Sequence, residues 1–249
     1  MIPLDRSGSS ELTTGICATD IRHPFSCIFL AFTLISFVFI ELLDLFRCIN
    51  PHEDTWLVAS FKGVTNRFVV EGTLGCPICS AEYPIVNGIA DFSALPEMPR
   101  RKVERPAGIH DREELATRAG AFLNVTEPGA TVVLGGAWAD AALELSVMTE
   151  ARVLAINPGA EAEESETVGL LLVGSEIPVA PGSLLGVALD ASFPAETVAS
   201  AVKAVRPGGR IVGPVEIPPS SELAVLAQNE DYWVAQKPPE VIKLSRAGR

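Results

Sequence analysis

Short apolar runs and amphipathic segments alternate along the second half of the chain, from about Glu113 onward. Apolar runs of strand length predict five buried strands, at residues 131–136, 151–158, 168–174, 183–189 and 209–217. Segments with apolar positions at helical spacing predict helices at residues 112–125, 139–150 and 195–205. Strands that alternate with helices pair in parallel, so we expect an α/β sheet covered by helices on both faces.

The end of the chain shows a different pattern. The segment DYWVAQKPPEVIKLSR, residues 231–246, contains two strand-like runs joined across Lys237, Pro238 and Pro239. Two consecutive strands with a short connection form a hairpin. We therefore expect the parallel sheet to end in an antiparallel hairpin.

The first half of the chain contains a Cys-x-x-Cys knuckle, Cys76 and Cys79, within residues 72–92. Two thiolates at this spacing lie on one side of a tight turn and supply half of a tetrahedral zinc site. Upstream, Cys48 and His52 form a second pair, and the loop between the pairs is rich in β-branched residues. Two ligand-bearing turns joined by a hairpin are typical of a zinc ribbon. In the alternative interpretation Cys48 closes a buried helix and His52 lies in a solvated loop.

Two segments of the first half, ELLDLFRC and CPICSAEYPIVNGIADF, resemble the small zinc-ribbon proteins that activate methyltransferases. In that family an apolar helix leads into the first knuckle, and the second continues as CPxCxxxYPIxxGIPxF. The resemblance covers about residues 41 to 92 and implies bound zinc and a protein partner for the ribbon. The matching residues are Tyr83, Pro84, Ile85, Gly88, Ile89 and Phe92.

Five parallel strands followed by a hairpin are the layout of class I S-adenosylmethionine-dependent methyltransferases. The segment AVKAVRPGGRIV, residues 201–212, resembles the LKPGGRLV segment of that family, in which a Pro-Gly-Gly turn ends a helix and starts the fifth strand. The resemblance spans about Glu113 to Arg249. It implies a Rossmann-like sheet that binds S-adenosylmethionine.

The resemblance also implies which residues hold the cofactor. Gly135 and Gly136 stand in the loop after the first strand, but Trp138 occupies a position where the family has a small residue. Asn157 ends the second strand, where the family has an acid that binds the ribose hydroxyls. Glu176, beside Ser175 after the third strand, is the expected substitute for the acid that contacts adenine.

No catalytic residue can be assigned from the sequence. Asp190 ends the fourth strand, where such enzymes keep substrate-handling groups, but it also suits the N-cap of the following helix. The three histidines, His23, His52 and His110, all precede the α/β segment. Base catalysis by histidine would therefore require His110 to fold over the sheet.

The net charge of -12 argues against binding to nucleic acids, because a surface that follows phosphates needs a basic excess. Five cysteines, two of them in a knuckle, indicate a reducing compartment, so we expect a cytoplasmic protein.

The N-terminal part of the chain offers an alternative location. Residues 25–40 are uncharged and apolar, and the hydrophobic segment reaches the length of a membrane span only when it extends through Glu41 and Asp44 to Phe46. Two alternatives are open. Residues 25–46 form a single membrane anchor, or they are a buried helix or an artificial extension of the chain.

These patterns divide the chain into five parts: a disordered leader (1–24), a hydrophobic helix (25–46), a zinc-ribbon-like domain (47–92), a Pro-rich basic linker (93–111) and a methyltransferase-like α/β domain (112–249). Two functions follow. The protein is either a methyltransferase with a weakened cofactor pocket and an activator-type ribbon, or a catalytically inactive protein of that fold that binds or activates another protein.

Overall fold

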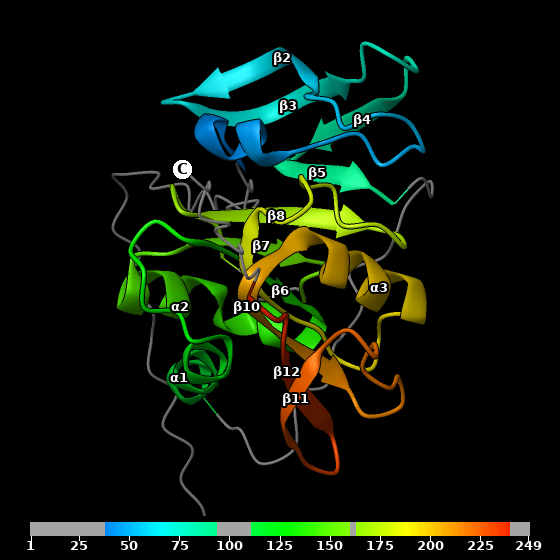
Figure 1. The fold of residues 1–249 in the computed structure, drawn as a ribbon. Helices are drawn as coiled ribbons and strands as arrows, with labels where there is room; N and C mark the ends of the chain where they lie inside the picture. Colours follow the sequence, from blue (N-terminus) through cyan, green and yellow to red (C-terminus); the bar gives the residue numbers. More distant parts are fainter. Residues whose placement is uncertain (1–37, 94–110, 160–162, 240–249) are drawn as a thin grey trace, which may run out of the picture. The chain divides into compact units, whose positions relative to one another are not determined.

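The computed structural model describes residues 38–93, 111–159 and 163–239 (Figure 1). Its centre is a sheet in which β5 (Ile89–Phe92) and five further strands run parallel. In spatial order after β5 these are β8 (Val168–Val173), β7 (Arg152–Ile156), β6 (Thr131–Gly135), β9 (Leu184–Ala188) and β10 (Val205–Pro214).

The five strands predicted from the apolar runs are thus present, and the Rossmann-like α/β class is confirmed. Their order reverses between β6 and β9, because the chain builds outward from β6 to β8 and then returns to the other side of β6. In open sheets of this kind, ligands bind outside the carboxyl ends of the strands at such a reversal. The carboxyl ends of β6, β7 and β9 are therefore the place to look for a cofactor site.

Helices cover both faces of the sheet, as the pattern predicts (Figure 1). On one face α1 (Arg112–Leu123) and α2 (Ala142–Thr149) pack over a core that contains Val132 and Leu134. On the other face α3 (Ala195–Ala204) packs over a core that contains Val133. Successive residues of β6 therefore enter opposite cores, which explains why its whole length is apolar.

The antiparallel edge is confirmed, but the predicted hairpin is wrong in its pairing. The hairpin consists of β11 (Ala224–Gln228) and β12 (Tyr232–Gln236), and β12 pairs with β10. Its turn is fixed by Asn229, whose side-chain oxygen accepts hydrogen bonds from the backbone N–H groups of Asp231 and Tyr232. DYWVAQ is thus the second strand of the hairpin and not the first, and residues 240–249 lie outside the described residues.

The ribbon segment is an antiparallel meander of β2 (Val58–Thr65), β3 (Phe68–Gly75), β4 (Glu82–Val86) and β5. Strand β5 has two partners, since it pairs antiparallel with β4 and parallel with β8. The meander and the α/β domain therefore share a continuous sheet of 12 strands. The predicted leader and almost all of the predicted linker, residues 94–110, lie outside the described residues.

The C-terminal end of the predicted hydrophobic helix adopts a different structure. Residues 38–46 form β1 (Val38–Phe39), which pairs with β3, and a 3-10 helix, η1 (Ile40–Leu45). Val38, Leu42 and Phe46 are at most 1% exposed and belong to the core. The prediction of one continuous helix is therefore wrong at Val38–Phe39, which form a strand, while Ile40–Leu45 are helical in 3-10 geometry; residues 25–37 are not described. Within the described ranges, no helix is long and apolar enough to cross a membrane.

Candidate metal centre and the cofactor end of the sheet

Four potential metal ligands converge beside the ribbon meander. Cys48 and His52 lie in the loop after η1, and Cys76 and Cys79 lie in the turn between β3 and β4. The three sulfurs and one imidazole nitrogen all lie within 4.8 Å of one another. The structure thus brings together all four residues of the predicted zinc site.

The separations of the ligand atoms suit zinc. A tetrahedral site with the usual Zn–S and Zn–N bond lengths separates two sulfurs by about 3.8 Å and a sulfur from a nitrogen by about 3.6 Å. Here Cys48 Sγ and Cys79 Sγ are 3.6 Å apart, and Cys76 Sγ lies 3.3 Å from His52 Nε2. Three thiols and one imidazole also form one of the common closed ligand sets for structural zinc.

Neighbouring polar groups orient these ligands. His52 Nδ1 lies 2.7 Å from the carbonyl oxygen of Glu53 and donates to it, which leaves Nε2 with a free lone pair facing Cys76. Asn50 Nδ2 donates to Cys79 Sγ at 3.3 Å, and the Tyr83 hydroxyl lies 3.2 Å from Cys48 Sγ. Neither Asn50 nor Tyr83 was predicted to contact a ligand. The only signal for Asn50 is its position between Cys48 and His52.

The same contacts shift the thiol pKa values apart. The pKa of Cys79 is lowered to about 6. The largest cause is a hydrogen bond from the Ala81 backbone, and the second is the hydrogen bond from Asn50. Burial is the main cause that raises the pKa of Cys48. Cys79 therefore presents a thiolate near neutral pH, which is the form that binds metal.

At the cofactor end of the sheet, the glycines after β6 face a protein side chain. Gly136 has a positive φ of 62°, and a Cβ built on it would collide with the carboxylate of Asp190. Asp190 Oδ2 also accepts a hydrogen bond of 2.7 Å from the backbone N–H of Ala137. The absence of a side chain at Gly136 thus lets the backbone lie against the Asp190 carboxylate.

Asp190 is not the N-cap of α3, so that interpretation was wrong. The helix begins at Ala195 after Pro194, and no side chain caps it. Asp190 instead closes a turn by accepting a hydrogen bond from the backbone N–H of Ser192 at 3.0 Å. The carboxylate therefore joins the ends of β6 and β9.

Asn157 lies at the end of β7, as predicted, but its side-chain amide forms hydrogen bonds with the backbone of β8. Its Nδ2 donates to the carbonyl oxygen of Val173 at 3.0 Å, and its Oδ1 accepts from the N–H of Val173 at 2.8 Å. Its φ of 47° places it in the left-handed region, which asparagine tolerates. The amide of Asn157 thus bonds to the backbone of β8 just beyond the last backbone pair of β7 and β8.

Trp138 and Glu176 also occupy places that differ from a cofactor pocket. Trp138 is 1% exposed, and its ring packs edge-on against Phe122 and Tyr232. Glu176 lines a cavity together with Cys48 and His52, beside the metal centre. The pairing of β6 with β7 places Gly135 opposite Ile156, so that Gly136 and Asn157 follow at the same edge of the sheet. The polar groups beside them, the Ala137 N–H and the Asn157 amide, are bonded within the protein, and Glu176 lines the cavity beside the metal centre.

No family model matches the sequence, and no curated protein matches it significantly. Solved structures that resemble this chain include a protein from Methanococcus maripaludis whose inferred function is that of an S-adenosyl-L-methionine-dependent methyltransferase, with 10% identity, a TM-score of 0.38, and coverage of 53% of this chain and 87% of that one. A geranyl diphosphate C-methyltransferase from Streptomyces coelicolor A3(2) has 13% identity and a TM-score of 0.34, with coverage of 45% and 52%. A phosphoethanolamine N-methyltransferase from Haemonchus contortus has 16% identity and a TM-score of 0.35, with coverage of 44% and 29%.

These three structural neighbours are described as methyltransferases, and a [4+2]-cyclase, SpnF, resembles the chain to a similar degree, with 12% identity and a TM-score of 0.35. At these identities and TM-scores the likeness carries no conclusion about activity. This chain also spans only about half, or less, of the length of the second and third of these proteins.

Proposed function

We propose that this chain is a non-catalytic protein of methyltransferase-like fold, in which a metal-clipped ribbon binds another protein. The observation that carries the proposal is the double hydrogen bond between Asn157 and the main chain of Val173. An acid at this position would bind the ribose hydroxyls through a free carboxylate. Here a neutral amide replaces the acid, and both of its polar groups bond within the protein.

Two neighbouring features support the same proposal. The backbone N–H of Ala137, which follows the glycines after β6, donates to Asp190 and not to solvent. Trp138 anchors this loop in the core between α1 and β12. A ligand that approached the loop would have to displace the half-buried Asp190 carboxylate from its hydrogen bond to Ala137.

The ribbon is the candidate binding element, although one of its edges is already covered. Strand β5 pairs with β8, so this edge is used within the chain. The opposite edge is β2, which pairs only with β3 among the described strands. Its apolar side chains Val58, Phe61 and Val64 are 63%, 37% and 48% exposed.

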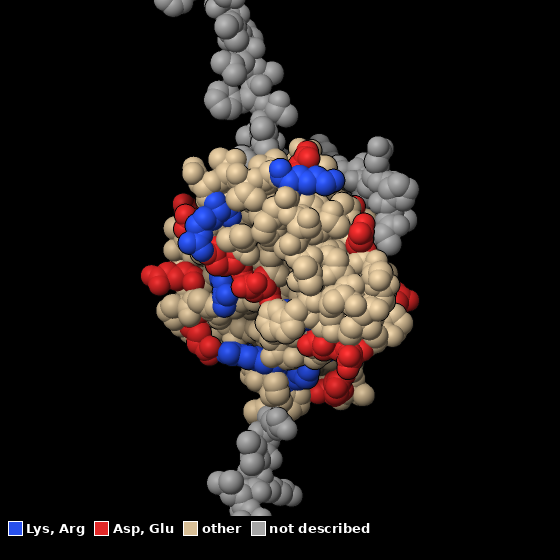
Figure 2. Space-filling view, turned by 90° about the horizontal axis from the view of Figure 1, so that it is seen from above, with Lys and Arg blue, Asp and Glu red and all other residues tan. Residues whose placement is uncertain are grey.

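The view onto the ribbon end of the molecule shows broad areas without Lys, Arg, Asp or Glu (Figure 2). Exposed edge strands with apolar side chains invite pairing with a strand of another chain. We therefore assign the contact with a protein partner to β2.

The second candidate function is binding of S-adenosylmethionine in an altered pocket. It is favoured by one observation, the Gly135–Gly136 turn at the reversal of strand order, where sheets of this type bind ligands. In this case the loop after β6 would have to release Asp190 when the ligand binds.

Titration calorimetry of the full-length protein with S-adenosylmethionine and S-adenosylhomocysteine distinguishes the non-catalytic function from cofactor binding. The non-catalytic proposal expects no saturable heat up to about 1 mM of either ligand. Saturable binding of one molecule per chain, abolished in Asp190→Arg but retained in an exposed control such as Glu196→Arg, would establish the second function instead.

The binding role has its own test. Proteins that co-purify with the wild-type chain should be lost from Phe61→Lys and Val64→Lys, which place a charge on β2. They should be retained by Val147→Lys, because Val147 is 75% exposed on α2, far from the ribbon in the fold. Equal recovery with all three variants would exclude β2 as the contact.

A further inference from the structure

A cavity of about 230 Å³ lies beside the metal centre and is used by neither proposed function. Three segments of the fold form it: the loop after η1, the loop between β8 and β9, and α3. Its polar and charged lining consists of Arg47, Asp54, Glu176, Ser200 and Lys203, next to Cys48 and His52.

The walls of this cavity are tied to one another by hydrogen bonds. The backbone N–H of Arg47 donates to the carbonyl oxygen of Pro178 at 2.9 Å, which joins the η1 loop to the β8–β9 loop. The backbone N–H of Ile177 donates to Ser200 Oγ at 2.9 Å, which joins the β8–β9 loop to α3. The space is therefore preformed, as small-molecule sites usually are.

Arg47 is a fixed cation in this wall. Its side chain is only 10% exposed, and Nη1 donates to the carbonyl oxygens of Asp44 and Phe46, each at 2.9 Å. Nε lies 3.6 Å from Asp54, and the guanidinium carbon lies 3.4 Å from the centre of the Trp56 ring.

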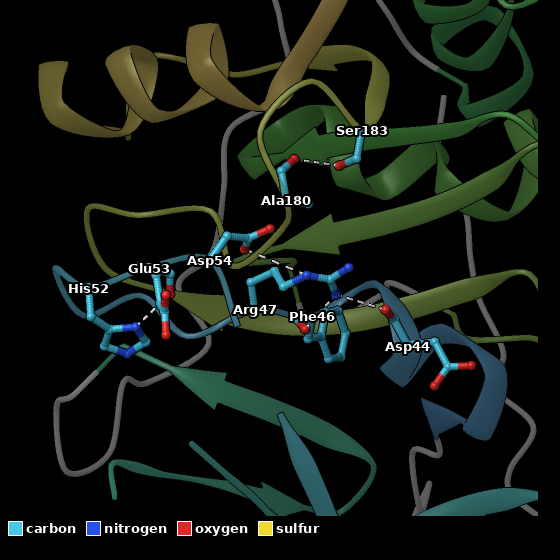
Figure 3. Close-up of polar contacts among 8 residues, drawn as sticks. All are labelled: Asp44, Phe46, Arg47, His52, Glu53, Asp54, Ala180 and Ser183. Carbon is cyan, nitrogen blue, oxygen red and sulfur yellow. Dashed lines mark hydrogen bonds and ion pairs between the residues drawn. The ribbon is translucent and has the colours of Figure 1, made fainter. Parts of the chain in front are cut away.

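Figure 3 shows Arg47 held between Asp54 and the carbonyl groups of Asp44 and Phe46, next to the loop that carries Ala180 and Ser183. These contacts engage Nη1 and cover one face of the guanidinium plane, while Nε faces Asp54 without a hydrogen bond. The described residues accept no hydrogen bond from Nη2.

Two further charges of opposite sign line the cavity. Lys203 comes from the last turn of α3, and Glu176 follows β8. Neither side chain forms a hydrogen bond or ion pair with the described residues. The cavity is thus lined by two cationic groups, from Lys203 and Arg47, and by the Glu176 carboxylate.

The remaining lining is aliphatic. It consists of Ile49, Ile177, Val179, Pro181 and Ala204.

We propose that this cavity binds a free α-amino acid with a short aliphatic side chain. Its carboxylate binds Arg47 and Lys203, its ammonium group binds Glu176, and its side chain contacts the aliphatic wall. Charge-assisted hydrogen bonds in a partly enclosed space provide the affinity, and the aliphatic wall together with the size limits the side chain. The proposal does not depend on the proposed function, because the cavity lies beside the metal centre and not at the loop after β6.

The test is calorimetric titration of the metal-loaded full-length protein with L-valine. We expect saturable binding of one molecule per chain at concentrations below about 10 mM. Lys203→Gln and Glu176→Gln should each weaken it at least tenfold, since each removes a charged partner. The matched controls Lys62→Gln in β2 and Glu196→Gln in the first turn of α3 should bind valine as the wild type does.

Two analogues examine the charges separately. Isovalerate lacks the ammonium group and isobutylamine lacks the carboxylate, so each should bind at least tenfold more weakly than valine. Binding of either analogue as tightly as valine would overturn the proposal, as would binding unaffected by Lys203→Gln and Glu176→Gln. Absence of valine binding to the wild type up to about 10 mM would also overturn it.

Discussion

Asn157 and Val173 exchange two hydrogen bonds, one from the side-chain Nδ2 to the carbonyl oxygen and one from the backbone N–H to Oδ1. Replacement of Asn157 by Asp removes the first bond and places a carboxylate oxygen against a carbonyl oxygen. We expect Asn157→Asp to lower the free energy of unfolding by about 1 to 3 kcal/mol, measured by urea denaturation. Under the proposed function it also creates no binding of S-adenosylmethionine.

The control for this variant is Asn124→Asp. Asn124 also has a positive φ, 54°, but it is an exposed C-cap of α1. The same chemical change there should alter stability by less than about 0.5 kcal/mol. Equal effects at the two positions would show that the left-handed conformation, and not the bond to Val173, determines the cost.

The second prediction concerns Gly136. Alanine at this position should destabilise the protein by at least about 2 kcal/mol, because it combines a strained positive φ with a collision against the Asp190 carboxylate. Gly129→Ala is the matched control: its φ of 73° is similar, but nothing lies within 4 Å of the added Cβ. It should therefore show only the conformational cost, about 1 to 2 kcal/mol.

A double-mutant cycle of Gly136→Ala with Asp190→Ala measures the collision directly. If the carboxylate lies as described, the loss on adding the methyl group is smaller in the Asp190→Ala background. Additive effects would contradict the contact between these residues.

The third prediction is that the purified chain carries about one zinc ion. Cys76→Ser and His52→Ala should lose or weaken it, because each removes one ligand of the cluster. Elemental analysis of protein prepared without chelators measures the metal content. Cys27→Ser should keep the metal, since the four clustered ligands already complete a tetrahedral shell.

Asn50 offers a subtler test of the same centre. Because its amide donates to Cys79 Sγ, Asn50→Ala should reduce zinc affinity about 10- to 100-fold without removing a ligand. Competition with a chromogenic chelator measures this change. An unchanged affinity would mean that the hydrogen bond does not support the ligand.

The fourth prediction concerns Trp138. Its burial against Phe122 and Tyr232 makes Trp138→Ala costly, by about 3 to 5 kcal/mol in unfolding free energy. Val147→Ala on α2, where the side chain is 75% exposed, should change stability by less than about 0.5 kcal/mol. A small effect of Trp138→Ala would place the indole outside the core.

Local sequence patterns were sufficient for the predicted parallel strands and for the grouping of the four candidate ligands. The strands β6, β8 and β9 are almost entirely apolar because both of their faces are buried, and this leaves a clear signal. Cys76 and Cys79 were found from their spacing, and Cys48 and His52 were then sought upstream as the second half of the site. The hairpin was misassigned because all five residues of β11 are exposed, so its pattern of apolar positions indicates no buried face.

Contacts between distant segments could not be predicted in the same way. The bond from Asn157 to Val173 depends on how far β7 and β8 extend past each other, which no local pattern specifies. Likewise, the expectation that Glu176 contacts adenine came from family position alone, because no local pattern specifies the path of the β8–β9 loop. In the structure this loop is bonded to α3, where Ser200 accepts from the Ile177 N–H.

The parallel pairing of β5 with β8 joins the ribbon and the α/β domain into one continuous sheet, so we expect the two to unfold together. Ala90, Asp91 and Phe92 lie opposite Leu171, Leu172 and Val173, so opening the ribbon exposes hydrogen-bonding groups of a central strand. Removal of the metal should therefore speed amide hydrogen exchange in β8, which lies about 120 residues along the chain from Cys48 and His52. The metal bound by the four ligands would in this way control the rate at which the larger sheet opens.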